Sequence, residues 1–160
     1  MAEGIWALTY AEKAARIYLF ECDSMWFEAL HKTFEPWKEK VFFVNKFVSD
    51  TNDDGKVTLD EFFKDKEINF IKADIKGSEI QMLKGAKSIL SRIDNLSLLL
   101  CAYHGHDHAE IIKAILEKNG FETEFSNRYM LIIDNDLREP YIRRGIIRAR
   151  KNHPPTGDDR

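Results

Sequence analysis

The sequence predicts an α/β domain with a doubly wound, mostly parallel sheet that ends in a C-terminal antiparallel hairpin. Short runs rich in β-branched and aromatic residues alternate with segments whose apolar residues recur at helical spacing. The connections between them are short, and no internal repeat is visible. This alternation is typical of parallel strands joined by helices, and 160 residues suit one domain.

The first half of the chain predicts two helices and two strands. Apolar residues recur every three or four positions in the helical segments, and Asp23 or Ser24 stands where an N-cap is expected. Val, Phe, Ile and Tyr dominate the runs between them, which favours strands. The predicted elements are a helix at 4–15, a strand at 16–21, a helix at 24–34 and a strand at 40–48.

The second half continues the same alternation. The run "LSLLLCAY" is apolar throughout, which is typical of a strand covered on both faces, and Asn119-Gly120 is a suitable helix end. The predicted elements are a short helix near 59–65, a strand at 68–75, a helix at 78–93, a strand at 96–103, a helix at 108–120, and hairpin strands at 121–126 and 129–134.

The C-terminal stretch 138–151 is basic with interleaved isoleucines. A membrane-surface or anionic-partner role is one interpretation. We favour a solvated helix or arm that packs its isoleucines on the domain. Residues 152–160 contain little that is apolar, so we expect one domain at 1–151 followed by a disordered tail.

Composition limits the classes of partner. A net charge of −3 argues against nucleic acid, and no apolar run approaches the ~20 residues of a membrane helix. The N-terminus lacks the features of a signal peptide, so we expect a cytoplasmic protein that has no membrane partner. Cys22 and Cys101 stand in apolar surroundings, and we expect two buried, reduced thiols.

Polar residues follow the predicted strands. In doubly wound sheets, ligands bind at the carboxyl ends of the strands. These ends carry Glu21-Cys22-Asp23, Ser49-Asp50, Asp74-Ile75-Lys76 and Tyr103-His104. Each of these sets except the last contains an acidic group, so the predicted ligand site includes carboxylates.

Residues 50–61 match the pattern of an EF-hand calcium loop, D-x-[DN]-x-[DN]-G-x5-E, at every position. An EF-hand needs a helix on each side of its loop and is usually paired with a second such unit. Here a predicted strand precedes the loop, and the chain holds no second loop. We therefore favour a polar connection built from turn-forming residues, and calcium binding ranks third among the functional hypotheses.

The stretch "INFIKADIKGSEIQMLKGAKSIL" resembles the FkbM-type methyltransferases, a class I family that uses S-adenosylmethionine. "YLFECD" and "VNKFVSD…VTLDEF" are similar to family segments on the N-terminal side, so the resemblance covers roughly residues 3 to 135. It implies a Rossmann-like fold. The implied function is transfer of a methyl group to a hydroxyl of a sugar or secondary metabolite, with a small-molecule or saccharide acceptor.

The resemblance implies a set of cofactor-binding residues. Glu21 matches the acidic residue expected to bind the ribose hydroxyls, because a carboxylate accepts two hydrogen bonds from a vicinal diol. Ser49 and Asp50 match the loop beside the adenine, and Asp74 matches the acid that faces the methionine end and the acceptor. Cys22, which adjoins Glu21, and Gly4, the last glycine of the family's glycine-rich loop, complete this predicted set.

The chain departs from the family at two places. Lys76 stands where the family usually has Glu, which indicates a different acceptor. The family's first strand and most of the glycine-rich loop are absent, so we expect an N-terminally truncated domain. Because that strand lies mid-sheet, another segment or a second copy of the chain fills the gap, or the sheet shifts to close it. The alternative function is a non-catalytic domain that acts through association.

The stretch "YHGHDH" at 103–108 follows a predicted strand and holds three histidines. Histidine suits a metal site or a general base. We favour a polar loop in which Asp107 caps the following helix, and we predict no metal site. Methyl transfer requires removal of one acceptor proton, and His104 and Asp74 are the candidate catalytic residues. The sequence does not choose between them.

Overall fold

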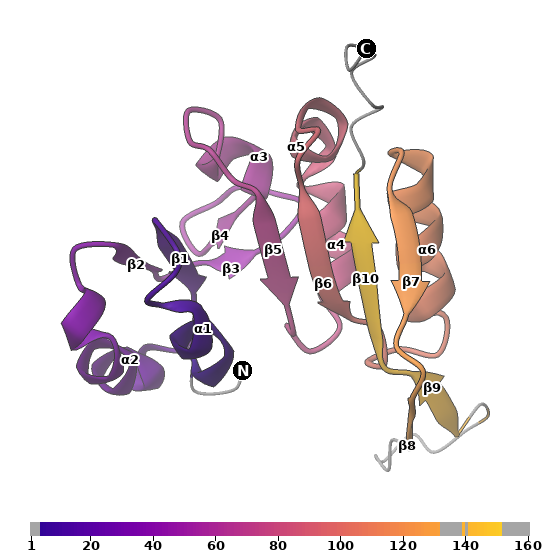
Figure 1. Ribbon diagram of the computed structural model, residues 1–160, viewed down its shortest axis with the longest axis horizontal. Helices are drawn as coiled ribbons and strands as arrows, with labels where there is room; N and C mark the ends of the chain where they lie inside the picture. Colours follow the sequence, from indigo (N-terminus) through magenta and orange to yellow (C-terminus); the bar gives the residue numbers. More distant parts are fainter. Residues whose placement is uncertain (1–3, 132–138, 140, 152–160) are drawn as a thin grey trace, which may run out of the picture.

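The computed structural model describes residues 4–131, 139 and 141–151 (Figure 1). Its α-helices are α1 (Ile5–Tyr10), α2 (Phe27–Thr33), α3 (Leu59–Phe62), α4 (Glu79–Lys84), α5 (Lys87–Arg92) and α6 (His108–Lys118), and the 3-10 helices η1 (Ser24–Trp26) and η2 (Glu35–Trp37) flank α2. Its strands are β1 (Ile17–Phe20), β2 (Val41–Val44), β3 (Phe47–Val48), β4 (Lys56–Val57), β5 (Phe70–Ala73), β6 (Ser97–Cys101), β7 (Glu122–Phe125), β8 (Tyr129–Leu131), β9 (Ile142–Arg144) and β10 (Ile146–Arg150).

The strand pairing confirms an α/β fold with mostly parallel strands and a C-terminal antiparallel part. The ladders β1-β2, β3-β4 and β5-β6 are parallel. The largest sheet has the order β5-β6-β10-β7, and β10 lies antiparallel between β6 and β7. The predicted hairpin joined strands at 121–126 and 129–134. In the structure β7 pairs instead with β10, and β8 pairs with β9. Residues 132–134 of the predicted hairpin and the predicted tail lie outside the described residues.

The prediction of a helix or arm at 138–151 is wrong for the described part of this stretch, which forms β9 and β10. Ile147 and Ala149 are buried, whereas Arg148 and Arg150 are exposed. This alternation with a period of two lays one face of β10 on the core and turns the other to solvent. The expected packing of the isoleucines holds for Ile147 alone, which has no exposed surface.

The main hydrophobic core lies between the four-stranded sheet and the helices that follow β5 and β6. Figure 1 shows α4 and α6 on one face of this sheet. Its largest fully buried apolar side chains come from both layers, and each contributes about 1.5–3 kcal/mol through burial. They are Leu83, Ile89, Leu90, Leu96, Leu100, Ile112, Leu116 and Ile147.

A second, smaller core attaches the β1-β2 sheet to α1 and α2. Phe34 and Leu30 of the α2 region pack with Val41 of β2 in this core. On the other face of β1, Tyr18 and Phe20 contact the main core. Both faces of β1 are therefore covered by apolar packing.

Two predicted elements are interrupted. The strand predicted at 40–48 breaks between β2 and β3, and the helix predicted at 78–93 breaks between α4 and α5 at Gly85-Ala86. A Cβ on Gly85 would lie 2.1 Å from the backbone oxygen of Ser49. The helix break thus coincides with a close approach of the chain after β3.

Within the described residues, no ladder joins the β1-β2 sheet to the β5-β6-β10-β7 sheet. In a parallel pair, every second residue directs its backbone groups to the neighbouring strand, and the others point to the opposite edge. Among the described strands, β1 and β5 each pair with one neighbour only, so each has an edge that no described strand pairs with. Ile17 donates its N–H to Lys40, and Ser97 donates its N–H to Asn69. The residues whose backbone groups point to the unpaired edges are therefore Tyr18, Phe20, Phe70 and Lys72.

No helix within the described ranges is long and apolar enough to cross a membrane.

Candidate active site

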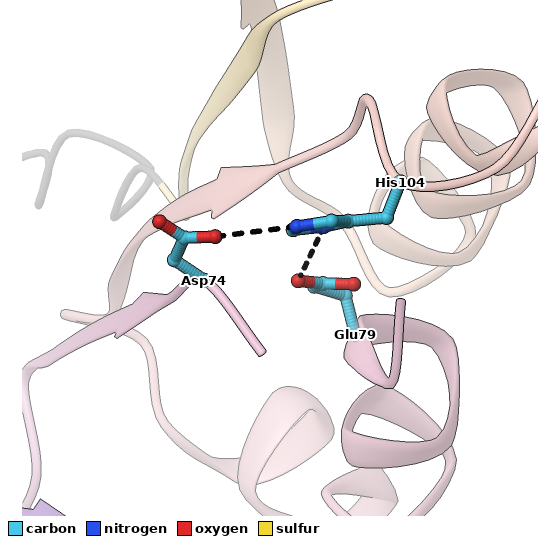
Figure 2. A group of neighbouring side chains, drawn as sticks. All are labelled: Asp74, Glu79 and His104. Carbon is cyan, nitrogen blue, oxygen red and sulfur yellow. Dashed lines mark ion pairs between the residues drawn. The ribbon is translucent and has the colours of Figure 1, made fainter. Parts of the chain in front are cut away.

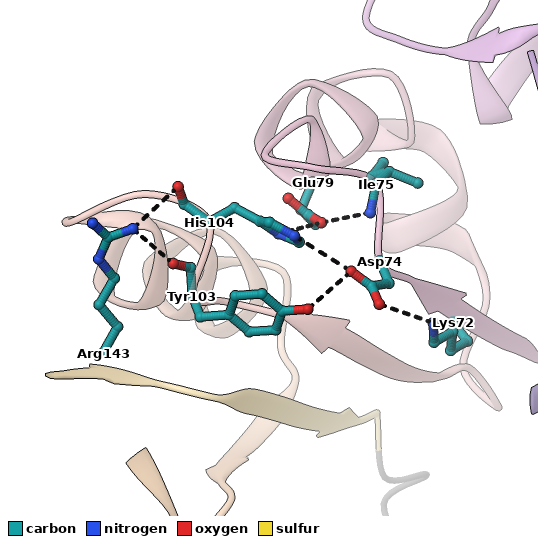
Figure 3. A network of polar contacts seen from close by, with 7 residues as sticks. All are labelled: Lys72, Asp74, Ile75, Glu79, Tyr103, His104 and Arg143. Atoms are coloured by element: carbon teal, nitrogen blue, oxygen red, sulfur yellow. Dashed lines mark hydrogen bonds and ion pairs between the residues drawn. The ribbon is translucent and has the colours of Figure 1, made fainter. Parts of the chain in front are cut away.

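The carboxyl ends of β5 and β6 bring the two predicted catalytic residues together. These strands are parallel and adjacent, with Ala73 opposite Leu100, so the residues that follow them emerge at the same edge. His104 Nε2 lies 3.4 Å from Asp74 Oδ1, and the Tyr103 hydroxyl donates a hydrogen bond of 3.2 Å to the same oxygen (Figure 3). The two candidate catalytic residues therefore lie close together, and their role in catalysis stays a prediction.

Glu79, at the start of α4, completes this group, although we did not predict it as a site residue. Its side chain has no exposed surface, and Oε1 accepts a 2.8 Å hydrogen bond from the Ile75 N–H. The same oxygen lies 3.1 Å from His104 Nδ1 (Figure 2). A turn with positive φ at Lys76 (51°) and Gly77 (97°) leads from β5 into α4 and brings the Glu79 carboxylate near Asp74.

The sequence contains a signal for Glu79. It is followed at helical spacing by Met82, Leu83 and Ala86, all of which are buried. A carboxylate in line with the apolar stripe of a helix is directed into the protein, where a charge needs a partner. Ser78 at the N-cap position makes no side-chain capping bond.

Arg143 supports the site from β9. Its side chain is 6% exposed, and Nη1 donates to the backbone oxygens of Tyr103 at 3.1 Å and His104 at 3.4 Å. These bonds connect the segment after β6 to β9 (Figure 3). We had assigned Arg143 only to a basic stretch, because its importance depends on the placement of β9.

Burial fixes the protonation of three neighbours. It raises the pKa of Tyr103 well above its ordinary value, so this hydroxyl remains a hydrogen-bond donor. It also raises the pKa of the Cys101 thiol to about 11, which keeps that thiol protonated. Burial lowers the pKa of His108 and outweighs the opposing effect of the Glu79 charge, so the neutral imidazole is favoured.

Asp107 lies at the N-cap of α6, but its side chain does not make the predicted capping bond.

Two predicted cofactor residues lie at the end of β1. Glu21 is half-buried, and its Oε1 accepts a 3.0 Å hydrogen bond from the Asp23 N–H. Its backbone oxygen accepts a bond from the Asn45 side chain at 3.1 Å. Cys22 is exposed, contrary to the expectation of a buried thiol. This strand end therefore presents an oriented carboxylate beside an accessible thiol.

The segment after β3 is held from two sides. Ser49 is 6% exposed, its N–H donates to Val57 at 3.0 Å, and its hydroxyl contacts the Asp50 carboxylate at 3.3 Å. Gly85 packs directly against the backbone of Ser49. The carboxylate of Asp50 is exposed, so a ligand can reach it.

The structure explains why residue 4 is a glycine. It lies at the N-cap of α1 with φ of 72°, which favours glycine. A Cβ there would lie 2.9 Å from side-chain atoms of Leu30 and Phe34. The absence of a side chain is thus required by the packing of α1 on α2, and the cofactor role of Gly4 stays a prediction.

The loop at 50–61 does not have the EF-hand architecture, since β2 and β3 precede it. Its polar side chains bond to the protein: Asn52 Oδ1 accepts from the Thr58 N–H at 2.8 Å, and Asp53 Oδ1 from the Gly55 N–H at 2.9 Å. Asp60 accepts from two N–H groups at the start of α5. Among the described residues, those of this loop do not form a cluster of metal-ligand side chains. The interpretation as a polar connection agrees with these contacts.

The fold is that of an α/β domain with polar residues at the carboxyl ends of its parallel strands. The model of the FkbM methyltransferase domain matches residues 13–123, which is more than half of the chain. The chain therefore belongs to the FkbM methyltransferase domain family. No curated protein sequence matches it significantly.

Solved methyltransferases share the fold at low sequence identity. An rRNA methylase from Streptococcus thermophilus aligns with a TM-score of 0.63 and 15% identity, over 96% of this chain and 83% of that one. A putative rRNA methylase from Clostridium thermocellum gives 0.60 and 11%, over 94% and 82%. A precorrin-6y C5,15-methyltransferase from Geobacter metallireducens gives 0.54 and 13%, over 93% and 76%. These likenesses support a Rossmann-like methyltransferase fold.

Family membership implies S-adenosylmethionine as the cofactor. The end of β1 fits such a group, because a backbone N–H orients the Glu21 carboxylate, and a carboxylate suits a ribose diol. Asp50, which comes shortly after β3, also presents an accessible carboxylate. Asp74, Glu79 and His104 form a separate polar group at the ends of β5 and β6.

Proposed function

We propose that this domain transfers the methyl group of S-adenosylmethionine to a hydroxyl of a small molecule or saccharide. The observation that carries the proposal is the contact of Asp74 with His104 and Tyr103 at adjacent strand ends, in a member of a methyltransferase family. The cofactor supplies an electrophilic methyl group on its sulfonium. The protein must then orient an acceptor and take one proton from it.

The residues at β5 and β6 suit this task. Asp74 Oδ2 lies 3.7 Å from Lys72 Nζ, and Oδ1 lies near Tyr103 and His104. A hydroxyl placed here can donate its proton to Asp74 or His104. Glu21, Cys22, Ser49 and Asp50, with Gly4 and Asp74, are the proposed cofactor-binding residues.

The chemistry of the site also favours the acceptor class. Its donors and acceptors match the hydroxyls of a saccharide or a polar metabolite. A net charge of −3 offers no general attraction for a polyphosphate backbone. The solved rRNA methylases therefore inform the fold, and we do not extend their substrate to this chain.

We expect S-adenosylmethionine to bind the purified chain, as measured by isothermal titration calorimetry. Glu21→Gln should weaken binding roughly tenfold to a hundredfold, because a hydrogen bond to a charged group contributes about 1.5–3 kcal/mol. Glu12→Gln changes an exposed glutamate near β1 and is the matched control. A folded sample that shows no binding at millimolar cofactor would contradict the proposal.

The unpaired edges of β1 and β5 favour a second candidate function, a domain that acts through association. Unpaired strand edges attract further strands. Phe70, at the edge of β5, is also 41% exposed although Trp6 stacks on its ring at 5.2 Å. We propose that a second copy of the chain adds a strand to one of these edges.

Amide hydrogen exchange tests this association. The N–H groups of all four edge residues should exchange quickly in dilute protein, and either Tyr18 and Phe20 or Phe70 and Lys72 should become protected as concentration rises. Ile71 and Ala73 belong to the ladder with β6 and are internal controls, protected at every concentration. A monomer throughout, as judged by sedimentation velocity with unchanged exchange at the four edge residues, would refute the association.

A further inference from the structure

The Asp74–Glu79–His104 group has the spacing of a metal site. One ligand atom of each residue lies within 4.8 Å of the others. The closest pair, Glu79 Oε1 and His104 Nδ1, is 3.1 Å apart (Figure 2). Two ligands that each lie about 2.1 Å from one ion at roughly a right angle are about 3 Å apart. The two side chains are thus as close as neighbouring ligands of one ion.

Unpartnered buried atoms supply an independent indication. Glu79 has no exposed surface, yet its Oε2 has no hydrogen-bond partner among the residues that the structure describes. His104 Nδ1 is also buried without a hydrogen bond, although a carboxylate oxygen lies 3.1 Å away. Leaving such groups buried and unpartnered costs free energy. A cation between them would satisfy both.

The neighbouring cationic side chains do not fill this role. Lys72 contacts Oδ2 of Asp74 and leaves Oδ1 facing His104. Arg143 directs Nη1 to the backbone oxygens of Tyr103 and His104. Neither forms a hydrogen bond with Glu79 Oε2. Two carboxylates and an imidazole therefore converge with a net need for positive charge.

We propose that Asp74, Glu79 and His104 bind one divalent transition-metal ion, Mn²⁺ or Zn²⁺. Carboxylate oxygens suit Mn²⁺ and imidazole suits Zn²⁺, and both ions accept such a mixed ligand set. The ligands come from the end of β5, the start of α4 and the end of β6, and three protein ligands leave a position open for an acceptor oxygen. This replaces the expectation that the chain has no metal site.

The role of the ion rests on the proposed function. A hydroxyl bound at the open position has a lowered pKa and therefore loses its proton more readily. In that state His104 is a ligand of the ion and does not accept the proton. Binding of the ion does not depend on the cofactor, so the two proposals are tested separately.

The test is titration of the chelator-treated whole chain with Mn²⁺, followed by electron paramagnetic resonance of the free ion, and with Zn²⁺, followed by calorimetry. We expect one site per chain and a higher melting temperature with the ion. Glu79→Gln and His104→Gln should weaken binding at least about a hundredfold. Glu110→Gln and His31→Gln change exposed residues and should bind as the original chain does.

A variant that should bind the ion more tightly distinguishes loss of the metal site from loss of folding. Lys72→Met removes the positive charge next to Asp74, and we expect it to tighten binding roughly threefold to tenfold. Equal binding by the original chain and Glu79→Gln, or no effect of Lys72→Met, would overturn the proposal. S-adenosylmethionine is titrated in chelator without the ion, so a failure of cofactor binding is recognised independently.

Discussion

Replacing Gly85 by alanine is expected to lower the free energy of unfolding by about 3 kcal/mol. The backbone of Gly85, with φ −86° and ψ 6°, is one that alanine adopts without strain. The cost therefore arises from space alone. The added Cβ would lie 2.1 Å from the Ser49 oxygen and 3.2 Å from Asp50 Cα, and both are backbone atoms that cannot rotate away. Urea denaturation measures the change.

Gly55→Ala is the matched control, because the nearest atom to its added Cβ is Asp53 Oδ1 at 3.8 Å. We expect a change within about 1 kcal/mol there. Since Ser49 and Asp50 are proposed cofactor residues, Gly85→Ala should also weaken S-adenosylmethionine binding, whereas Gly55→Ala should not. Equal stability of the two variants would show that the segment after β3 yields easily.

Strands with strong local signals could be predicted from the sequence. The runs that form β1, β5 and β6 are rich in aliphatic and aromatic residues, which favour extended structure. Because these strands could be located, the polar residues that follow them could be located as well. Asp74 and His104 meet because parallel neighbouring strands end at one edge of the sheet.

Features that depend on distant contacts could not be read in this way. The break at Gly85 reflects the backbone of Ser49, which is 36 positions earlier in the chain. The insertion of β10 between β6 and β7 is likewise a long-range arrangement, and it decides that Arg143 supports the site. The alternation of Ile147 and Ala149 with arginines was a strand signal, but the high charge of the stretch suggested a solvated helix or arm.

Replacing His104 by glutamine is expected to lower kcat for methyl transfer roughly 10²–10⁴-fold, the usual contribution of a positioned proton acceptor. S-adenosylhomocysteine formation with a panel of hydroxylated saccharides measures turnover. Cofactor affinity should be unchanged, because His104 is not among the proposed cofactor residues. A variant that retains more than about a tenth of the original kcat would exclude a direct role in the chemistry.

Three further comparisons test the roles of His104 and its neighbour Tyr103. Tyr103→Phe removes only the hydroxyl that donates to Asp74 Oδ1, and we expect about a tenfold loss, equivalent to roughly one hydrogen bond. His31→Gln, on the surface of α2, should leave turnover unchanged. Chelator separates the two roles of His104: a proton acceptor works without a metal, whereas a cation ligand does not. If chelator lowers kcat as far as His104→Gln does, His104 acts through the ion, because either treatment then removes the same group from the acceptor oxygen.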